Sequence, residues 1–425
     1  MQTSFSPAQL ADPETAESAG IVRKCVHCGF CTATCPTYVL LGDELDSPRG
    51  RIYLIKDMLE HPEQPVMDAH VRHVDRCLSC LSCMTTCPSG VHFGHLVDHA
   101  RSHIERHYRR PLPERLLRAA LGWLLPSPFR FRLALIAAMP LRWLGGAVPG
   151  RLGAMLRLAP AAPHPPSAAE RPQIFAAAGV RRGRVALLAG CVQNALAPAI
   201  NEATIRLLTR HGIEVVVAEG AGCCGALNLH LGQEDQARSL ARRNVAAWRD
   251  LEIDAILSNA SGCGTMVKDY GHLLREEAAY AADAARISER ARDISEYLAG
   301  IELSAPVIAT GQRVAYHSAC SLQHGQGVRE QPKQLLQRMG FAVADVPEGH
   351  LCCGSAGSYN LLQPEIAAAL RDRKLAAIAT TGAELVAAGN IGCITQLGSA
   401  ADRPVLHTVE LLDWATGGPR PASLG

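Results

Sequence analysis

The chain has 425 residues, enough for two or three domains with their own hydrophobic cores. Apolar residues make up 48% and charged residues 19%, and the formal net charge is +2, so the charge balance gives no reason to expect nucleic acid or an acidic substrate. Sixteen cysteines in so long a chain, without a secretory leader at its start, favour reduced, metal-binding thiols in the cytoplasm over a disulfide scaffold.

The first eight cysteines form two copies of one spacing. The segments CVHCGFCTATCP (25–36) and CLSCLSCMTTCP (77–88) both fit C-x2-C-x2-C-x3-C-P. Three thiolates at this spacing surround three corners of a cubane cluster, and the fourth, before the proline, ligates the other cluster. Structural zinc is the alternative, but a zinc ion needs only four ligands. The spacing predicts two [4Fe-4S] clusters, one held by Cys25, Cys28, Cys31 and Cys87 and the other by Cys77, Cys80, Cys83 and Cys35.

These motifs define a helical, ferredoxin-type domain over residues 21–105, which follows a polar tail at residues 1–20. The stretch RIYLIKDMLE between the motifs predicts a short helix. Basic side chains near the first motif have two interpretations: they raise the potential of a cluster, or they form surface ion pairs with neighbouring carboxylates. The basic residues are Arg49, Arg51 and Lys56, and the carboxylates are Asp43, Glu44 and Asp46.

Residues 106–180 contain an arginine-rich segment and a Pro/Ala-rich linker. Between Arg101 and Pro160 there are eleven Arg, two Glu and no Lys. Apolar runs broken by prolines predict short amphipathic helices here. One interpretation is helices that pack on both neighbouring domains and leave their arginines in solvent. The other is a basic amphipathic surface, with Trp123 and Trp143, that contacts an anionic membrane or a partner subunit.

Residues 181–300 and 301–418 are two copies of one unit. Cys191 and Cys320 are 129 residues apart, Cys223 and Cys352 are also 129 apart, and Cys263 and Cys393 are 130 apart. Each copy alternates strand-like with helix-like segments; in the first these are VALLAG, INEATIRLLTRHG, IEVVVAEG, QEDQARSLARRNVAAW and DAILSNA. The alternation predicts a parallel α/β sheet with every cysteine at the carboxyl end of a strand or the start of a helix, where α/β folds place their sites.

Each copy has one cysteine, then a Cys-Cys-Gly triplet, then another cysteine. Soft thiolate ligands favour a cluster in one or both copies. A metal-free redox thiol site is one alternative, and zinc or buried structural cysteines are another. The two histidines best placed beside cysteines, His27 and His317, are expected to hydrogen-bond a cluster sulfur or the backbone rather than to act in catalysis. The eight cysteines are Cys191, Cys223, Cys224, Cys263, Cys320, Cys352, Cys353 and Cys393.

Together the motifs resemble those of the iron-sulfur subunit of bacterial glycolate oxidase. The resemblance rests on CVHCGFCTATCPTYVLLGDELDSPRGRIYLIK, DRCLSCLSCMTTCPSGV, AGCCGALNLHLG and HLCCGSAGSYNLLQPE, and it runs from about residue 20 to the C-terminus. It implies an α-helical domain with two [4Fe-4S] clusters followed by a duplicated α/β CCG domain. It also implies a glycolate dehydrogenase that is inactive as this chain alone: flavin-bearing subunits oxidise glycolate to glyoxylate, and this chain passes their electrons toward quinone.

The CCG repeats are also similar to the CCG-containing subunit of heterodisulfide reductase and to iron-sulfur subunits of lactate and glycerol-3-phosphate dehydrogenases. An equivalent subunit of those dehydrogenases, or a thiol–disulfide reductase, is therefore the alternative function. The reductase pattern ends in CxxC, whereas Met266 and Gln396 stand at its last position here, which argues against disulfide cleavage. The sequence has no flavin signature, so the flavin is expected on partner subunits, and the chain in the cytoplasm or at the cytoplasmic face of the inner membrane.

Overall fold

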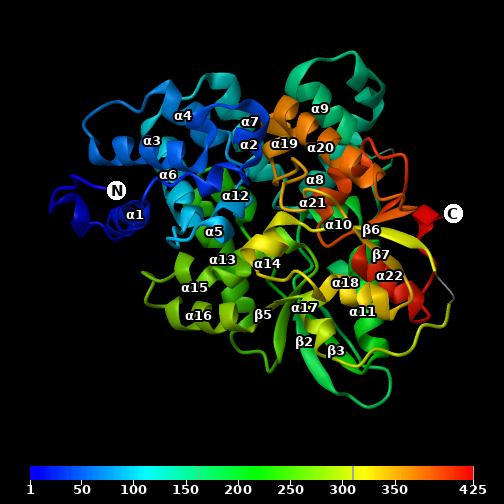
Figure 1. Cartoon of the computed structure of the whole chain (residues 1–425). Helices are drawn as coiled ribbons and strands as arrows, with labels where there is room; N and C mark the ends of the chain where they lie inside the picture. Colours follow the sequence, from blue (N-terminus) through cyan, green and yellow to red (C-terminus); the bar gives the residue numbers. More distant parts are fainter. Residues whose placement is uncertain (161, 309–310, 425) are drawn as a thin grey trace.

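The computed structural model describes residues 1–160, 162–308 and 311–424. Figure 1 shows the N-terminal helices gathered on one side of the molecule, with two α/β units below and beside them. This arrangement confirms the predicted fold class, a helical N-terminal domain followed by a duplicated α/β domain.

Short helices surround the two cysteine loops of the N-terminal domain. In the longest of them, α6, the residues Leu96, Val97, Ala100 and Ile104 are fully buried, a helical spacing that turns one face toward α3 and α4. The helices are α1 (Pro13–Lys24), α2 (Pro36–Leu41), α3 (Pro48–Glu60), α4 (Asp68–Asp75), α5 (Ser82–Thr86) and α6 (Phe93–His107), with 3-10 turns η1 (Gln9–Ala11), η2 (Phe30–Thr32) and η3 (Glu44–Asp46).

The predicted polar tail at residues 1–20 is folded instead. Asp12 accepts a hydrogen bond from the Thr15 backbone N–H at 2.8 Å and so caps α1. The apolar side of α1 is buried in the N-terminal core, and the acidic side chains on its polar side pair with arginines of the first repeat. The segment looks polar in the sequence because its carboxylates pair with arginines in a remote part of the chain.

Helices α7 (Leu112–Leu124), α8 (Pro128–Ala138) and α9 (Gly150–Leu158), with the 3-10 helix η4 (Met139–Gly146), form the arginine-rich segment. The expectation of solvated arginine faces is wrong for its best-paired members. Arg118 donates to Asp75 at 2.8 Å and Arg132 donates to Glu170 at 2.9 Å, and both arginines are buried. Apolar side chains are exposed instead, because remote carboxylates hold the arginines inside. Among the described residues no single helix is long and apolar enough to cross a membrane, although η4 with α8 (Pro128–Gly146) and α9, bent by 116°, pass that test together.

Each repeat folds around a parallel sheet with the same strand order. The order is β3-β2-β4-β5 in the first repeat and β7-β6-β8-β9 in the second, and β1 joins the first sheet antiparallel to β3. The strand order therefore reverses beside β2 and β6, and α/β folds place their ligands at the carboxyl ends of strands at such points. The strands are β1 (Gln173–Phe175), β2 (Gly183–Leu187), β3 (Ile213–Val217), β4 (Ala255–Ser258), β5 (Ala291–Asp293), β6 (Arg313–His317), β7 (Ala342–Asp345), β8 (Leu385–Ala388) and β9 (Val405–His407).

Helices cover these sheets, and the two predicted in the first repeat, at INEATIRLLTRHG and QEDQARSLARRNVAAW, are among them. The first repeat contains α10 (Val192–Leu196), α11 (Ala199–Arg210), α12 (Ala226–His230), α13 (Glu234–Trp248), α14 (Ser261–Lys268), α15 (Tyr270–Leu273), α16 (Ala281–Arg290) and α17 (Ile294–Ala299). The second contains the π-helical turn η6 (Ser321–Gly325), α18 (Gln331–Arg338), α19 (Tyr359–Leu362), α20 (Pro364–Ala379), α21 (Ile391–Gly398) and α22 (Thr408–Ala415). The short turns η5 (Ala168–Glu170) and η7 (Ala422–Leu424) lie outside the sheets.

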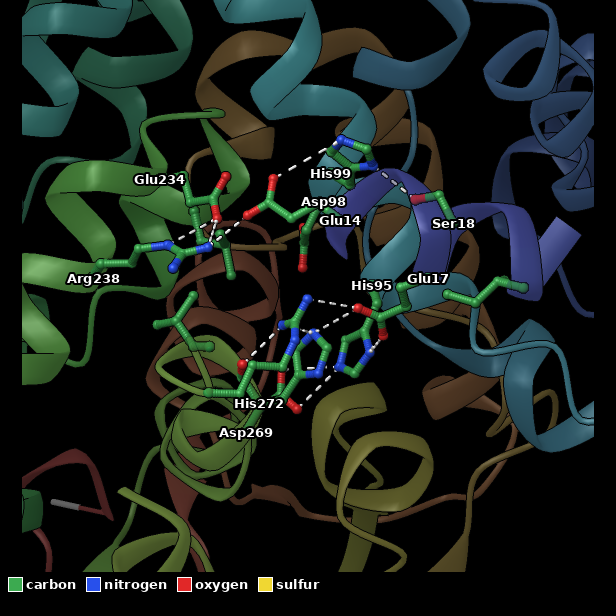
Figure 2. Close-up of a pocket in the computed structure, with 14 residues that line it drawn as sticks. Glu14, Glu17, Ser18, His95, Asp98, His99, Glu234, Arg238, Asp269 and His272 are labelled. Carbon is green, nitrogen blue, oxygen red and sulfur yellow. Dashed lines mark hydrogen bonds and ion pairs between the residues drawn. The ribbon is translucent and has the colours of Figure 1, made fainter. Parts of the chain in front are cut away.

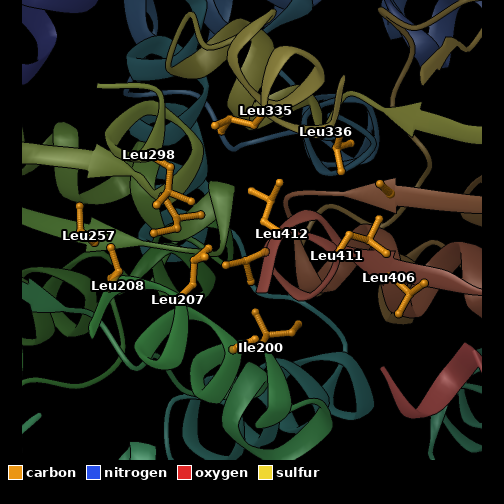
Figure 3. Close-up of a cluster of buried hydrophobic side chains, with 14 of the residues drawn as sticks. Ile200, Leu207, Leu208, Leu257, Leu298, Leu335, Leu336, Leu406, Leu411 and Leu412 are labelled. Atoms are coloured by element: carbon orange, nitrogen blue, oxygen red, sulfur yellow. The ribbon is translucent and has the colours of Figure 1, made fainter. Parts of the chain in front are cut away.

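The two repeats share one hydrophobic core. Helix α11 of the first packs on α22 of the second, and α17 of the first packs on α18 of the second. Leu207, Leu208, Leu335, Leu411 and Leu412 meet there, each at most 1% exposed, as Figure 3 shows. Because each repeat completes the core of the other, the loops that carry the cysteines are held by a single packed body.

Candidate metal centres

The four cysteines predicted to hold the first cluster line one pocket of the N-terminal domain. Cys25, Cys28 and Cys31 come from the first loop, and Cys87 reaches the same pocket from the end of α5. Burial raises the pKa of Cys31 to about 11. A thiol must lose its proton to bind iron, so loading this group would release protons.

The second group gathers beside the first. Burial raises the pKa of Cys83 well above its usual value, and the neighbouring thiols of Cys80, Cys77 and Cys35 raise it further. Cys35 comes from the first motif, so the structure brings the fourth cysteine of each motif toward the first three of the other. This is the arrangement that two clusters with exchanged fourth ligands require.

The two loops also share an unusual backbone. His27 and Ser79 have φ of 55° and 49°, and Gly29 and Leu81, two residues further along each motif, have φ of 85° and 61°. Left-handed residues at matched positions turn successive N–H groups toward one side, which makes a concavity suited to an anion such as an iron-sulfur cluster. Three of the four residues are not glycine, so the loops hold backbone strain that a bound group would justify.

Arg51 joins the second cysteine group to a buried carboxylate. Its guanidinium contacts Asp46 at 3.2 Å and donates toward the Cys35 sulfur at 3.7 Å, and both charged side chains are at most 1% exposed. Arg49 instead pairs with Glu44 at 2.5 Å near the surface. The two interpretations of the basic residues therefore each apply to one of these arginines: Arg51 brings positive charge to a cysteine sulfur, and Arg49 forms a surface ion pair.

In the first repeat the four cysteines converge at the end of the sheet. Cys191 follows β2, and its sulfur lies 3.4 Å from the sulfur of Cys223. Hydrogen bonds from Cys191 and then Cys224 lower the pKa of Cys223 well below its usual value. Cys224 in turn shares hydrogen bonds with Cys223 and Cys263, which raise its pKa. Four thiols in one chain of contacts are chemically suited to a soft metal or a cluster.

The second repeat repeats this geometry and adds a histidine. The Cys320 and Cys352 sulfurs are 3.7 Å apart, and Cys353 contacts Cys352 and Cys393. A ring nitrogen of His317 and the sulfurs of Cys353 and Cys393 all lie within 4.8 Å of one another. Burial lowers the pKa of His317 to about 3, so this side chain is neutral. The expected hydrogen bond from His317 to the backbone is not present among the described residues.

The glycine of each Cys-Cys-Gly triplet is required by the backbone. Gly225 and Gly354 have φ of +92° and +89°, and a Cβ on them would lie 3.0 Å from the Ala237 carbonyl oxygen and 2.4 Å from that of Ala367. Only glycine suits a left-handed residue pressed against another helix. The cysteine pairs are thereby held close to α13 and α20.

Met266 and Gln396, at the last CxxC positions, have packing roles. Met266 lies in the core of the first repeat. The buried Gln396 side chain accepts a hydrogen bond from Asn360 at 3.0 Å and donates one to the Ala367 carbonyl at 3.0 Å. Neither side chain is free to serve as a fifth ligand for its cysteine group.

The N-terminal domain contacts the second repeat through its second cysteine group. Cys80 and Cys352 belong to one buried apolar cluster, and Cys320 packs against it. The Cys320 thiol faces Cys80 closely enough to raise the pKa of Cys80, which burial has already raised. Tyr359 fastens the contact by donating to the Arg76 carbonyl at 3.0 Å. The cysteine groups of the two domains are therefore neighbours, a relation that the sequence does not reveal.

A polar pocket joins the N-terminal domain to the first repeat (Figure 2). His95 lies 3.1 Å from Glu17 and 3.1 Å from Asp269, and its ring stacks on His272. These groups are common metal ligands, but the Arg275 guanidinium lies 2.8 Å from Glu17 and 2.9 Å from the His272 ring. Because a cation of the chain itself already satisfies them, we interpret the pocket as an ionic junction between domains.

Sequence reasoning missed one charged group at the second repeat. Lys374 on α20 is 2% exposed, and its ammonium donates to the Glu348 carbonyl at 2.6 Å. Burial lowers its pKa, and the thiols of Cys353 and Cys352 counteract that shift. A lysine in a helix normally reads as solvated, but alignment of the two repeats would have revealed it, because Asn244 stands at the matching place in the first.

Comparison with known families identifies both parts of the chain. A family described as a 4Fe-4S dicluster domain matches residues 24–91. A family described as a cysteine-rich domain, CCG, matches residues 185–268 and again residues 314–398. These matches confirm the duplication and the prediction of 4Fe-4S clusters as cofactors.

Several known proteins are similar to this chain. The glycolate oxidase iron-sulfur subunit of Escherichia coli K12 is 43% identical over 419 residues, which are 98% of this chain and 99% of that protein. Lactate utilization protein A of Bacillus velezensis is 27% identical over 239 residues, 54% of this chain and 99% of that protein. A hypothetical protein from Helicobacter pylori, known from a crystal structure, shares the fold at 9% identity, with a TM-score of 0.55 over 96% of this chain and 73% of that one.

Proposed function

The chain belongs to the family of glycolate oxidase iron-sulfur subunits, and from this premise we propose that it receives electrons from a flavin-bearing subunit that oxidises glycolate and passes them toward quinone. It is an electron-transfer subunit of an oxidoreductase complex and carries 4Fe-4S clusters. The observation that supports the route is the buried contact between Cys80 of the N-terminal domain and Cys320 and Cys352 of the second repeat.

We assign the ligands as two exchanged sets. The first set consists of Cys25, Cys28, Cys31 and Cys87. The second set consists of Cys77, Cys80, Cys83 and Cys35. When bound, the clusters supply one-electron transfer without an open coordination site. The chain holds their sulfur ligands in loops with left-handed residues and places the Arg51 charge beside Cys35, which favours the reduced state. In this proposal the cysteine group of the second repeat receives electrons next, after the clusters of the N-terminal domain.

The partner surface in this proposal consists of the exposed apolar side chains of the arginine-rich segment. Trp143 is 80% and Phe129 70% exposed, and further large apolar side chains are exposed along the same helices: Leu116, Trp123, Leu133, Ile136 and Leu141. Exposed apolar patches of this kind mark interaction sites. We propose that this face contacts another subunit of the complex, in the cytoplasm at the inner face of the membrane.

The cluster assignment is tested with the full chain purified without oxygen. Wild-type protein is expected to contain at least about eight irons with matching acid-labile sulfide, and its reduced form to show two interacting clusters by EPR. Cys28→Ser and Cys35→Ser should each disturb a different cluster, although both residues lie in the first motif. If both changes disturb the same EPR signal, the exchanged ligand sets are wrong.

The electron route is tested in the complete complex. Cys80→Ser should abolish glycolate-dependent quinone reduction while the flavin subunit still reduces an artificial dye. Retained quinone reduction would refute a route through Cys80.

The docking surface is tested with the paired change Trp143→Ser and Phe129→Ser. Loss of co-purification with the other subunits, at unchanged iron content, supports the surface. Binding of the chain alone to phosphatidylglycerol vesicles, abolished by the same changes, would assign the surface to the membrane instead.

A further inference from the structure

The two repeats differ where their cysteines meet. Position 317 of the second repeat corresponds to position 188 of the first, since both stand three residues before the first cysteine of the unit. Leu188 is 2% exposed and packs in the apolar core of its repeat. His317 takes the same place at the end of β6. The second repeat therefore has a nitrogen donor where the first has only carbon.

His317 has no other task among the described residues. It is 1% exposed, and neither ring nitrogen has a hydrogen-bond partner there. Leaving a buried polar group unpaired destabilises the fold, so native structures rarely keep one without a role. Its ring nitrogen instead lies within 4.8 Å of the sulfurs of Cys353 and Cys393.

The surroundings of the second group also suit a charged centre. The Lys374 ammonium is buried beside its thiols, whereas the neutral Asn244 in the first repeat hydrogen-bonds the Cys223 carbonyl at 3.0 Å. Lys374 forms no ion pair among the described residues, and the charges that offset its burial are those of the Cys353 and Cys352 thiols, then the Glu348 carboxylate and the Cys393 thiol. A centre with several thiolate ligands carries such negative charge.

We propose that His317 is the fifth protein ligand of an iron-sulfur centre held by the four cysteines of the second repeat, and that the first repeat lacks an equivalent ligand. This inference rests on the proposed function, in which electrons pass from the cluster at Cys80 to the second repeat. His317 supplies the fifth ligand that Gln396 cannot supply, because the Gln396 side chain is already hydrogen-bonded to Asn360 and Ala367. The two repeats, equal in fold, thus differ in chemistry, and only the second is built to exchange electrons with the N-terminal domain.

The test uses the full chain loaded anaerobically with ⁵⁷Fe and sulfide, and grown with ¹⁵N-labelled histidine. Mössbauer spectra report the iron sites, and pulsed EPR reports nitrogen bound to them. His317→Leu copies the residue of the first repeat, and His317→Cys supplies a sulfur ligand in its place. His324→Leu is the matched control, because His324 lies in the same repeat but bonds Thr85 at 2.7 Å instead of facing the cysteines.

A directly bound histidine nitrogen is expected in the wild type and in His324→Leu, and its coupling is expected to vanish in both His317 variants. His317→Cys should retain the iron of the centre, and it serves as the comparison if His317→Leu precipitates. A wild-type centre without histidine coupling, or a coupling that survives both changes, overturns the proposal.

Cys353→Ser separates this outcome from failure of the proposed function. The change should lower the iron content by up to about four atoms per chain. If it leaves the iron unchanged, or if the second repeat binds zinc, the second repeat is not an electron-transfer station, and both inferences fail. If iron is lost but no histidine coupling exists in the wild type, only the role of His317 fails.

Discussion

Three left-handed glycines give a quantitative test of how the cysteine pairs are held. Gly190, Gly225 and Gly354 have φ of +80°, +92° and +89°, so an alanine at any of them meets the same backbone penalty of about 1–2 kcal/mol. Their surroundings differ: no atom lies within 4 Å of a Cβ on Gly190, whereas a carbonyl oxygen lies 3.0 Å from one on Gly225 and 2.4 Å from one on Gly354.

The expected losses of unfolding free energy follow from these distances. Gly190→Ala should lose only the backbone term. Gly225→Ala needs a shift of a few tenths of an ångström, and we expect a total loss of about 2 kcal/mol. Gly354→Ala must push a helix backbone away, which adds about 1–3 kcal/mol, for a total of about 2–5 kcal/mol.

Urea unfolding of the three variants, compared at equal m-values, measures the series. Gly354→Ala should also lose metal from the second repeat, since Cys352 and Cys353 move with the glycine. A loss for Gly190→Ala as large as that for Gly354→Ala would refute the reasoning, because strain would then come from the backbone angle alone.

Three further changes test other parts of the structure. Burial lowers the pKa of His407 to about 4 from 6.5, so the folded chain binds fewer protons than the unfolded one, and this group alone lowers stability by about 3 kcal/mol as pH drops from 6.5 to 4; His407→Asn should reduce the slope of the urea midpoints across that window by this share, and the other histidines with lowered pKa, His103, His272, His317 and His324, keep the rest of the slope. Arg51→Met removes one buried partner of Asp46, which keeps Arg76 at 2.8 Å and His73 at 2.9 Å, and should lower the unfolding free energy by about 1–3 kcal/mol, against less than about 1 kcal/mol for Arg49→Met at the surface; similar urea midpoints for the two would contradict this. Leu412→Ala should cost about 2–5 kcal/mol and shift both repeats together in a thermal scan, and separate transitions would show that the core is not shared.

Much of the fold follows from local sequence. The strands and helices that the sequence predicts in the first repeat lie where expected, at β2, α11, β3, α13 and β4, because each is a short element with its own apolar residues. The shorter elements of the repeats are not predicted, and the arginine-rich segment forms short helices without predicted bounds. Three cysteines of the first motif line one pocket together, since a loop of this length keeps its thiols close, whereas the assignment of the fourth ligands stays a prediction.

What the sequence does not reveal depends on remote partners. From the sequence, Arg118 and Arg132 are expected in solvent. In the structure they are buried, because they pair with Asp75 and Glu170. The helix α1 reads as a tail because the arginines that pair with it lie more than two hundred residues away. Likewise, only packing shows that Cys80 faces the second repeat and not the first.

Helix α11 packs on α22, and α17 packs on α18. This reciprocal packing is the contact pattern of a two-fold symmetric dimer, formed here within one polypeptide. In a true homodimer every substitution appears in both halves, so a ligand gained at one site is gained at the other. A fused pair is free of that constraint: one half can keep a leucine and serve as a scaffold while the other acquires a histidine and a buried lysine. Duplication within the chain thus produced a symmetric pair of domains whose two sites can change independently of each other.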